Sequence, residues 1–213
     1  MKFLKLFFII TIPFNLIAQE TSNSKAGEFE LGMRNTISTF NSTGNAGVGF
    51  GGQFRIRLGN RINTEWFADF IAEDIEGLAK RNDHHIGWSV MFYPFNPSGK
   101  KVVPYILAGH CFDYTKISPV INYYDQDYQN DASRLSSATQ AGLGLHIYIA
   151  DNFNLSVSSQ YMIHLGNDIH TEIYEHNGHK EIHIEQHDAN ESLSLEGHLL
   201  FTISLNYKIA DLW

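Results

Sequence analysis

The sequence predicts an all-β protein, an eight-stranded antiparallel up-and-down transmembrane β-barrel. Three observations lead to this fold class. Apolar and polar residues alternate with a period of two along eight segments, as in strands with one apolar face. No apolar run beyond the N-terminal segment approaches the ~20 residues of a membrane-spanning helix. The lysines beyond that segment fall in the links between strand segments or at strand ends.

The composition excludes several classes of protein and of partner. The 213 residues suffice for one domain, and a content of 43% apolar residues excludes a disordered chain. A single cysteine, Cys111, excludes a disulfide scaffold and a thiolate metal cluster. The formal net charge of -8 argues against nucleic acid as a partner, because binding to nucleic acid needs a basic surface.

The first residues have the pattern of a targeting segment. Lys2 and Lys5 precede an apolar stretch from Phe7 to Ile17, and Ala18 offers a small residue for cleavage. This pattern predicts a secretory signal peptide over residues 1–19, with the barrel domain over residues 20–213. The alternative is a membrane-anchoring helix, but the stretch is too short to cross the ~30 Å of hydrocarbon in a bilayer.

The alternation is clearest in the second strand segment. Val48, Phe50 and Phe54 share one parity there, and Gln53 and Arg55 share the other. A helix would scatter these apolar residues around its circumference, so the pattern indicates a strand. The eight expected strands are Gly27–Ile37, Gly47–Leu58, Ile62–Ala72, His84–Tyr93, Val102–Asp113, Thr139–Ile149, Asn154–Leu165 and Leu195–Ile209. The fifth segment has two competing apolar sets, and the pattern does not decide which of them faces inward. One set is Val103, Tyr105 and Leu107, and the other is Ile106, Ala108 and Phe112.

The links between these strands alternate in length. Gly59–Arg61 and Ala150–Phe153 are tight, and residues 94–101 form a moderate turn. The other links are longer and polar, at Ser38–Ala46, Glu73–Asp83, Tyr114–Ala138 and Gly166–Ser194. An even number of strands, with short turns at one rim and long loops at the other, is typical of a closed barrel. Closure is required in lipid, which offers no partners for unpaired backbone groups.

The character of the two faces favours a membrane barrel over a soluble barrel with an apolar interior. The polar parity is rich in Gly, Ser, Thr and Gln, which suit a narrow interior. Lysines avoid the strands, as expected for a face in contact with lipid. Aromatic residues near strand ends are expected to form interfacial girdles: Tyr93, Tyr105, Tyr161 and Tyr207, with Trp66 and Trp88 less clearly placed.

The interior of an eight-stranded barrel is just wide enough to be filled by side chains, so we expect no wide pore. The parity assigns it the charges Glu28, Glu30, Arg34, Arg55, Arg57, Glu65 and Asp69. These residues are interpreted as a self-neutralising salt-bridge plug, with a polar conduit or proton path as the alternative. His110, His146 and His198 are expected to face inward as hydrogen-bond partners, and His84 and His85 to begin a strand.

The chain resembles the small bacterial outer-membrane barrel family of the OmpA, OmpX and opacity-protein type. The resemblance rests on the signal peptide, the alternating strands, the segment Val103–Gly109 and the ending Leu205–Trp213. It implies an outer-membrane location with both termini in the periplasm. It also implies recognition by the barrel-assembly machinery through the last strand, which ends at Trp213.

Some barrels of this size are enzymes, and His164 is the nearest match to their chemistry. Outer-membrane lipid A deacylases resemble this fold and carry a His-x-Ser pair with a nearby acid. In this sequence Gly166 stands at the position of the serine, so the acyl-enzyme route has no nucleophile. A hydrolase activity would require Glu65 or Glu196 to lie near His164.

The last long link is rich in histidines and acids, with Lys180 as its one base. Its histidines are His170, His176, His179, His183 and His187, and its acids are Asp168, Glu172, Glu175, Glu181, Glu185, Asp188 and Glu191. Part of the link is expected to form a hairpin above the membrane that turns near Asn177 and Gly178, with His183 beside Glu181 and Glu185. The main interpretation is a hydrophilic acidic loop, and weak binding of a divalent metal is the alternative.

The resulting prediction is a monomeric, non-enzymatic outer-membrane barrel with a structural or adhesive role, exercised through long extracellular loops. Its expected partners are outer-membrane lipids and the assembly machinery, without nucleic acid. The prediction includes no cofactor, metal or catalytic residue. The alternatives are a lipid-modifying hydrolase at the barrel rim, and a barrel that binds a small solute or a metal.

Overall fold

The computed structural model describes residues 25–40, 46–120, 131–166, 168–176, 179–187 and 197–213. The predicted signal peptide lies outside these residues. The strands are β1 (Glu28–Phe40), β2 (Ala46–Arg57), β3 (Ile62–Ile75), β4 (Ala79–Phe92), β5 (Val102–Pro119), β6 (Ala132–Ala150), β7 (Phe153–Leu165), β8 (Asp168–His176), β9 (His179–His187) and β10 (Gly197–Asp211). In the described ranges no helix is long and apolar enough to cross a membrane.

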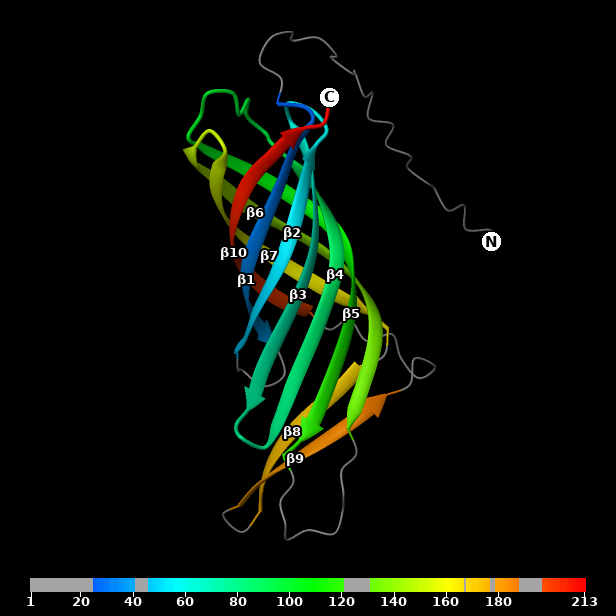
Figure 1. Ribbon diagram of the computed structural model, residues 1–213. Helices are drawn as coiled ribbons and strands as arrows, with labels where there is room; N and C mark the ends of the chain where they lie inside the picture. The colour runs from blue at the N-terminus through cyan, green and yellow to red at the C-terminus, as the bar shows by residue number, and fades with distance from the viewer. Residues whose placement is uncertain (1–24, 41–45, 121–130, 167, 177–178, 188–196) are drawn as a thin grey trace, which may run out of the picture.

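Eight of these strands form a closed antiparallel barrel in the order β1-β10-β7-β6-β5-β4-β3-β2 (Figure 1). The barrel closes where β1 pairs with β10, from Glu28 opposite Asp211 to Phe40 opposite His198. The predicted eight-stranded barrel is therefore confirmed. The rim where β10 ends, at the top of Figure 1, is called the terminal end below, and the opposite rim is called the loop end.

Five strands, β1 and β3 to β6, extend at least three residues further toward the loop end than the alternation predicts. β5 has 18 residues and β6 has 19, although about 9–11 residues suffice to cross the bilayer. The expected link Glu73–Asp83 contains only a tight turn, and most of Tyr114–Ala138 is strand. These extensions lack a lipid-facing apolar stripe, so period two gives them no hydrophobic signal. Lys80 and Lys116 belong to them and point outward into solvent.

The apolar face of the barrel wall points outward and the polar face points inward, as predicted. Phe50 and Leu143 on the outside are 67% and 64% exposed, whereas Arg55 inside is 1% exposed. The apolar stripe thus points away from the barrel axis. Trp66 and Trp88 face outward, with their ring centroids 6.4 Å apart.

Two members of the expected aromatic girdle lie elsewhere. Tyr161 and Tyr207 are exposed on the outer wall, but Tyr93 and Tyr105 are buried inside the barrel. Tyr105 belongs to the inward set of β5 with Val103 and Leu107, and Tyr93, just after β4, keeps the inward parity of Met91. Tyr105 therefore packs in the lumen beside Tyr93, Met91, Val103 and Leu107.

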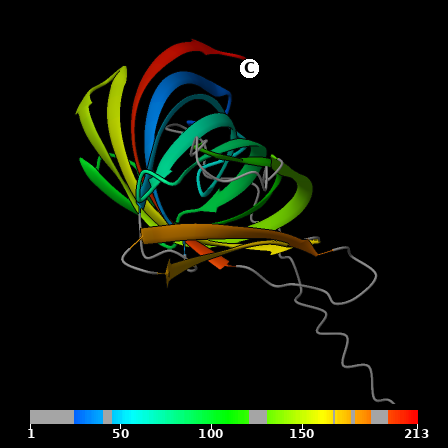
Figure 2. The same ribbon diagram turned by 90° about the horizontal axis from the view of Figure 1, so that it is seen from below.

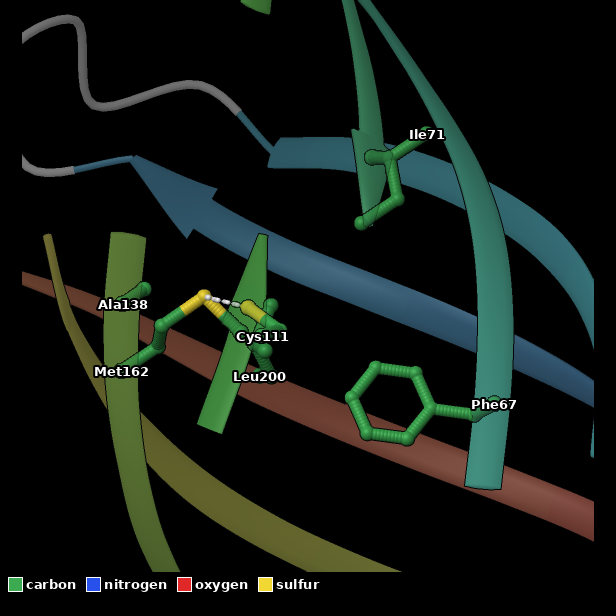
Figure 3. Close-up of a cluster of buried hydrophobic side chains, with 6 residues drawn as sticks. All are labelled: Phe67, Ile71, Cys111, Ala138, Met162 and Leu200. Atoms are coloured by element: carbon green, nitrogen blue, oxygen red, sulfur yellow. Dashed lines mark hydrogen bonds between the residues drawn. The ribbon is translucent and has the colours of Figure 1, made fainter. Parts of the chain in front are cut away.

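A second apolar cluster lies inside the barrel. Figure 3 shows it, with the Cys111 thiol donating a hydrogen bond to the Met162 sulfur at 3.7 Å. Its members come from β3, β5, β6, β7 and β10: Phe67, Ile71, Cys111, Ala138, Met162 and Leu200. It is called the central apolar cluster below. Cys111 thus serves as a buried apolar side chain, as expected for most free cysteines.

The predicted hairpin is confirmed as β8 and β9, although its turn residues 177–178 lie outside the described part of the chain. It lies across the loop-end mouth (Figure 2) and is called the roof below. Its inner face packs against the extended strands through a third apolar cluster of Ile75, Ala79, Ile117, Ala132, Ile169, Ile173, Ile182 and Ile184. The roof is therefore held by apolar packing.

Candidate functional site

The terminal-end half of the lumen holds the predicted salt-bridge network. Arg55 donates to Glu65 Oε2 through Nη2 at 2.6 Å and through Nε at 2.9 Å. Arg34 spans Glu65 and Asp69, at 3.2 and 3.0 Å. All seven charges assigned to the interior from sequence are buried: Glu28, Glu30, Arg34, Arg55, Arg57, Glu65 and Asp69. The placement predicted from parity is confirmed, and each of these seven charges lies within 4 Å of an opposite charge.

A second polar network, nearer the loop end, went unrecognised at the sequence level. Asp113 of β5 lies between two imidazoles, with Oδ1 3.1 Å from His85 Nε2 and Oδ2 3.1 Å from His164 Nδ1. Asp83 accepts hydrogen bonds from Arg81 Nε at 3.1 Å and from Thr115 Oγ1 at 2.6 Å. Each of these side chains is buried.

The sequence pattern does not predict this network because its residues lie at the ends of expected strands or in an expected loop. Asp113 was expected to end a strand of uncertain phase, His85 to begin one, and residues 114–138 to form a loop. Only the observed extension of β4, β5 and β6 places all of them on inward positions. Among the predicted inward histidines, His146 and His198 are buried in the lumen. His110 is wrongly assigned: it has the outward parity of Phe112, against whose ring it packs.

The central apolar cluster lies between the two polar networks on β5 and β7, whereas on β3 and β4 the networks adjoin, because Asp69 pairs in register with His85. Moving two residues along a strand leads from one layer to the next, from Cys111 to Asp113 on β5 and from Met162 to His164 on β7. The loop-end network is then followed by the apolar cluster beneath the roof, which Ile117 reaches on β5. Within the described residues, the apolar cluster beneath the roof therefore lies between the loop-end network and the loop-end solvent, which disfavours a continuous polar conduit.

His164 does have a hydroxyl and a carboxylate beside it, but their geometry differs from that of a hydrolase. Ser136 Oγ lies 3.2 Å from His164 Nδ1, and Asp113 Oδ2 lies 3.1 Å from the same nitrogen. A catalytic relay needs the acid on one ring nitrogen and the nucleophile on the other. All three side chains are also buried. Glu65 is held by Arg34 and Arg55 instead, and Glu196 lies outside the described residues.

The hydrolase alternative predicts a measurable product, so it can be tested directly. We expect lipid A from cells that carry the wild-type barrel and the His164→Ala variant to have the same mass. The physical reason is that Ser136 cannot transfer its proton to a ring nitrogen that already faces Asp113. Mass spectrometry of extracted lipid A makes the comparison. A loss of acyl chains that disappears in both His164→Ala and Ser136→Ala would contradict this expectation.

The outer face of the roof carries alternating imidazoles and carboxylates. His170 Nε2 lies 3.0 Å from Glu172 Oε1, and His183 Nε2 lies 2.8 Å from Glu185 Oε1. In the pairing of β8 with β9, His170 is opposite Glu185 and Glu172 is opposite His183. The predicted placement of His183 beside Glu185 is confirmed. Across the described part of the chain, no three His, Cys, Asp or Glu side chains are grouped so that they could hold a metal ion.

Next to its turn, the roof hairpin is tied to the barrel by an ion pair. Lys180 Nζ lies 2.6 Å from Glu76 Oε2, and this carboxylate raises the pKa of the Lys180 ammonium above its ordinary value. Glu76 adopts a positive φ of 52° in the turn between β3 and β4. The side chains of Asp168, His176, His179 and His187, and residues Asp188 and Glu191, lie outside the described part of the structure.

The fold matches solved outer-membrane barrels, whereas the chain matches no protein-family model and no curated protein sequence. Neisserial surface protein A is 10% identical with a TM-score of 0.58, over 88% of this chain and 100% of that one. A major outer-membrane protein of Thermus thermophilus is 10% identical with a TM-score of 0.56, over 85% and 99%.

A third similar structure is Ail, the attachment invasion locus protein of Yersinia pestis. It is 14% identical with a TM-score of 0.53, over 86% of this chain and 99% of that one. Ail has also been solved in complex with the heparin analogue sucrose octasulfate. These likenesses show the fold of small bacterial outer-membrane barrels. Together with the apolar outer wall, they support the outer-membrane location that the sequence predicts.

Proposed function

We propose that this protein is a non-enzymatic outer-membrane barrel that makes surface contacts through its loop end. The observation that carries the proposal is the roof: an ordered hairpin held by apolar packing on strands that project beyond the lipid-spanning length. A filled lumen leaves little room for transport. An ordered polar platform above the bilayer is suited to contact with another surface.

The orientation follows from the lengths of the connections. In barrels of this kind the short turns face the periplasm and the long loops face outward. The two longest connections of this barrel, from β5 to β6 and from β7 to β10, lie at the loop end beside the tight β3–β4 turn, and the β2–β3 and β6–β7 turns at the terminal end are short. The roof would then face the surroundings of the cell. Trp213, which is 67% exposed just beyond β10, remains our proposed contact for the assembly machinery.

The negative charge of the roof indicates which kind of surface it can bind. Its outer face presents Glu172, Glu181 and Glu185, while Lys180 is paired with Glu76. Ail provides a contrast, because its solved complex contains a sulfated, strongly anionic sugar. Repulsion between like charges disfavours such a partner for this roof. A cationic surface fits it better.

The test compares cells that display the wild-type barrel, cells that display a Glu172→Lys, Glu181→Lys, Glu185→Lys variant, and cells without the barrel. We expect the wild type to add adherence to immobilised poly-lysine but not to heparin, and the variant to reverse this preference. The three substitutions leave the inward isoleucines in place, so the roof should keep its packing. Equal adherence of all three strains on both surfaces would count against the proposal.

A further inference from the structure

The outer wall of the barrel contains a hollow of about 510 Å³, formed by β5, β6, β7 and β10. Its centre is Ser159, whose small side chain lies between Leu143 of β6 and Phe201 of β10 in the register of the sheet. Large apolar residues surround this position, including Ile106, Leu145 and Val157. The hollow therefore exists because one bulky side chain is missing from the lipid-facing stripe.

The floor of the hollow is fixed from inside the barrel. Gly144 lines it, and a Cβ atom at this glycine would clash with the ring of Tyr105, which packs in the lumen. The floor is therefore glycine backbone backed by the Tyr105 ring, which leaves no room on the lumenal side for a side chain at position 144. Because Tyr105 and its lumenal neighbours are buried and packed together, we expect the floor to be rigid.

The position of the hollow indicates what fills it. It lies on the apolar outer face, where the surrounding solvent is the hydrocarbon of the bilayer. Its lining is almost entirely apolar, and a dry hollow of this size would lose the dispersion contacts that its walls could make. An acyl chain supplies these contacts. Water does not, because hydrocarbon separates the hollow from the aqueous phase.

One end of the hollow leads to a basic turn. Pro94 and Pro104 line it on the side of the terminal end, and the turn of residues 94–101 follows there. The only charged residues in this turn are Lys100 and Lys101, both exposed. Lys100 Nζ lies 5.8 Å from the centroid of the Phe95 ring, which is itself exposed beside Pro94. Two cations thus lie next to the end of an apolar hollow.

We propose that this hollow is a binding site for a membrane glycerophospholipid, with an acyl chain against Ser159 and Gly144 and the phosphate at Lys100 and Lys101. Four residues of extended chain separate Lys100 from Pro104, or ~13 Å. That is a suitable span from a headgroup to the upper part of its acyl chain. Two lysines favour an anionic headgroup over a zwitterionic one. The site is independent of the roof and of the surface contacts proposed for it.

The experiment uses the full barrel, refolded into vesicles of equal phosphatidylglycerol and phosphatidylcholine, then extracted and examined by native mass spectrometry. We expect the wild type to retain one phosphatidylglycerol in preference to phosphatidylcholine. Lys100→Gln with Lys101→Gln should weaken that preference, by roughly fivefold for each lysine. Unchanged headgroup selectivity in this variant would overturn the assignment of the two lysines.

The hollow itself is tested by filling it. Ser159→Phe should abolish lipid retention, whereas Ala68→Phe, which enlarges an exposed outward residue on β3 away from the hollow, should leave it unchanged. Heat-modifiable gel migration confirms folding, and Ser159→Leu serves if the phenylalanine prevents it. Equal retention by the wild type and the folded Ser159 variant would overturn the proposal. Loss of retention in Ala68→Phe as well would also overturn it, since the effect would not be specific to the hollow.

Discussion

Replacing Arg55 with methionine is expected to lower the free energy of unfolding by about 3–5 kcal/mol, the cost of leaving buried charges without their partner. Arg55 makes its two shortest ion-pair contacts with Glu65, at 2.6 and 2.9 Å, and lies 3.8 Å from Glu30. It also donates to Ser156 Oγ at 2.9 Å. Methionine keeps most of the volume but none of these interactions. Urea unfolding in lipid vesicles measures the effect.

A second substitution separates the loss of charge from the loss of packing. Combining Arg55→Met with Glu65→Gln should recover at least about 1 kcal/mol, since without Arg55 the single guanidinium of Arg34 has to neutralise both Glu65 and Asp69. The matched control is Lys116→Met, because the Lys116 pair with Asp131 is solvent-exposed on both sides and should contribute nothing measurable. If Arg55→Met proved as stable as the wild type, water would have to hydrate Glu65, and the lumen would not be the closed network described above.

The barrel itself could be predicted because alternation reports burial directly. Val48, Phe50 and Phe54 alternate with Gln53 and Arg55, and only a strand puts those sets on opposite faces. The same parity placed the terminal-end charges inside the lumen, where the structure finds them. Where polar residues occupy both faces, as in the loop-end half of β4, the alternation no longer distinguishes the inward face from the outward face. The strand extensions and the Asp113 network were missed for that reason.

The phase of β5 shows a second limit. Its two sets of apolar residues compete because the lumen next to this strand is itself apolar, with Val103, Tyr105 and Leu107 inside and Ile106 and Phe112 outside. A strand that is apolar on both faces carries no parity signal. The phase is settled only by pairing, which sets Gly144 of β6 opposite Tyr105. The misplaced Tyr105 and the misassigned His110 both follow from this one ambiguity, whereas Tyr93 follows β4 and keeps the inward parity of Met91.

Placing an arginine at Ile203 is expected to destabilise the barrel by about 2–4 kcal/mol, the cost of a cation at the bilayer midplane. Ile203 points outward from β10 and is 53% exposed on the apolar wall. Ile209 is its matched control, since it lies on the same face of the same strand and is 51% exposed. Six residues separate the two positions, or ~20 Å along the strand.

With a strand tilt of about 45°, that separation moves the charge ~14 Å in depth, from the midplane to the interface. Ile209→Arg should therefore cost at most about 1 kcal/mol, since an arginine there can extend into the headgroup region. Urea titration of both variants in vesicles gives the two free energies of unfolding. A difference between them requires lipid against this face, because water would solvate both arginines equally. Equal stabilities would mean that the outward stripe does not contact acyl chains, and the membrane placement would be wrong.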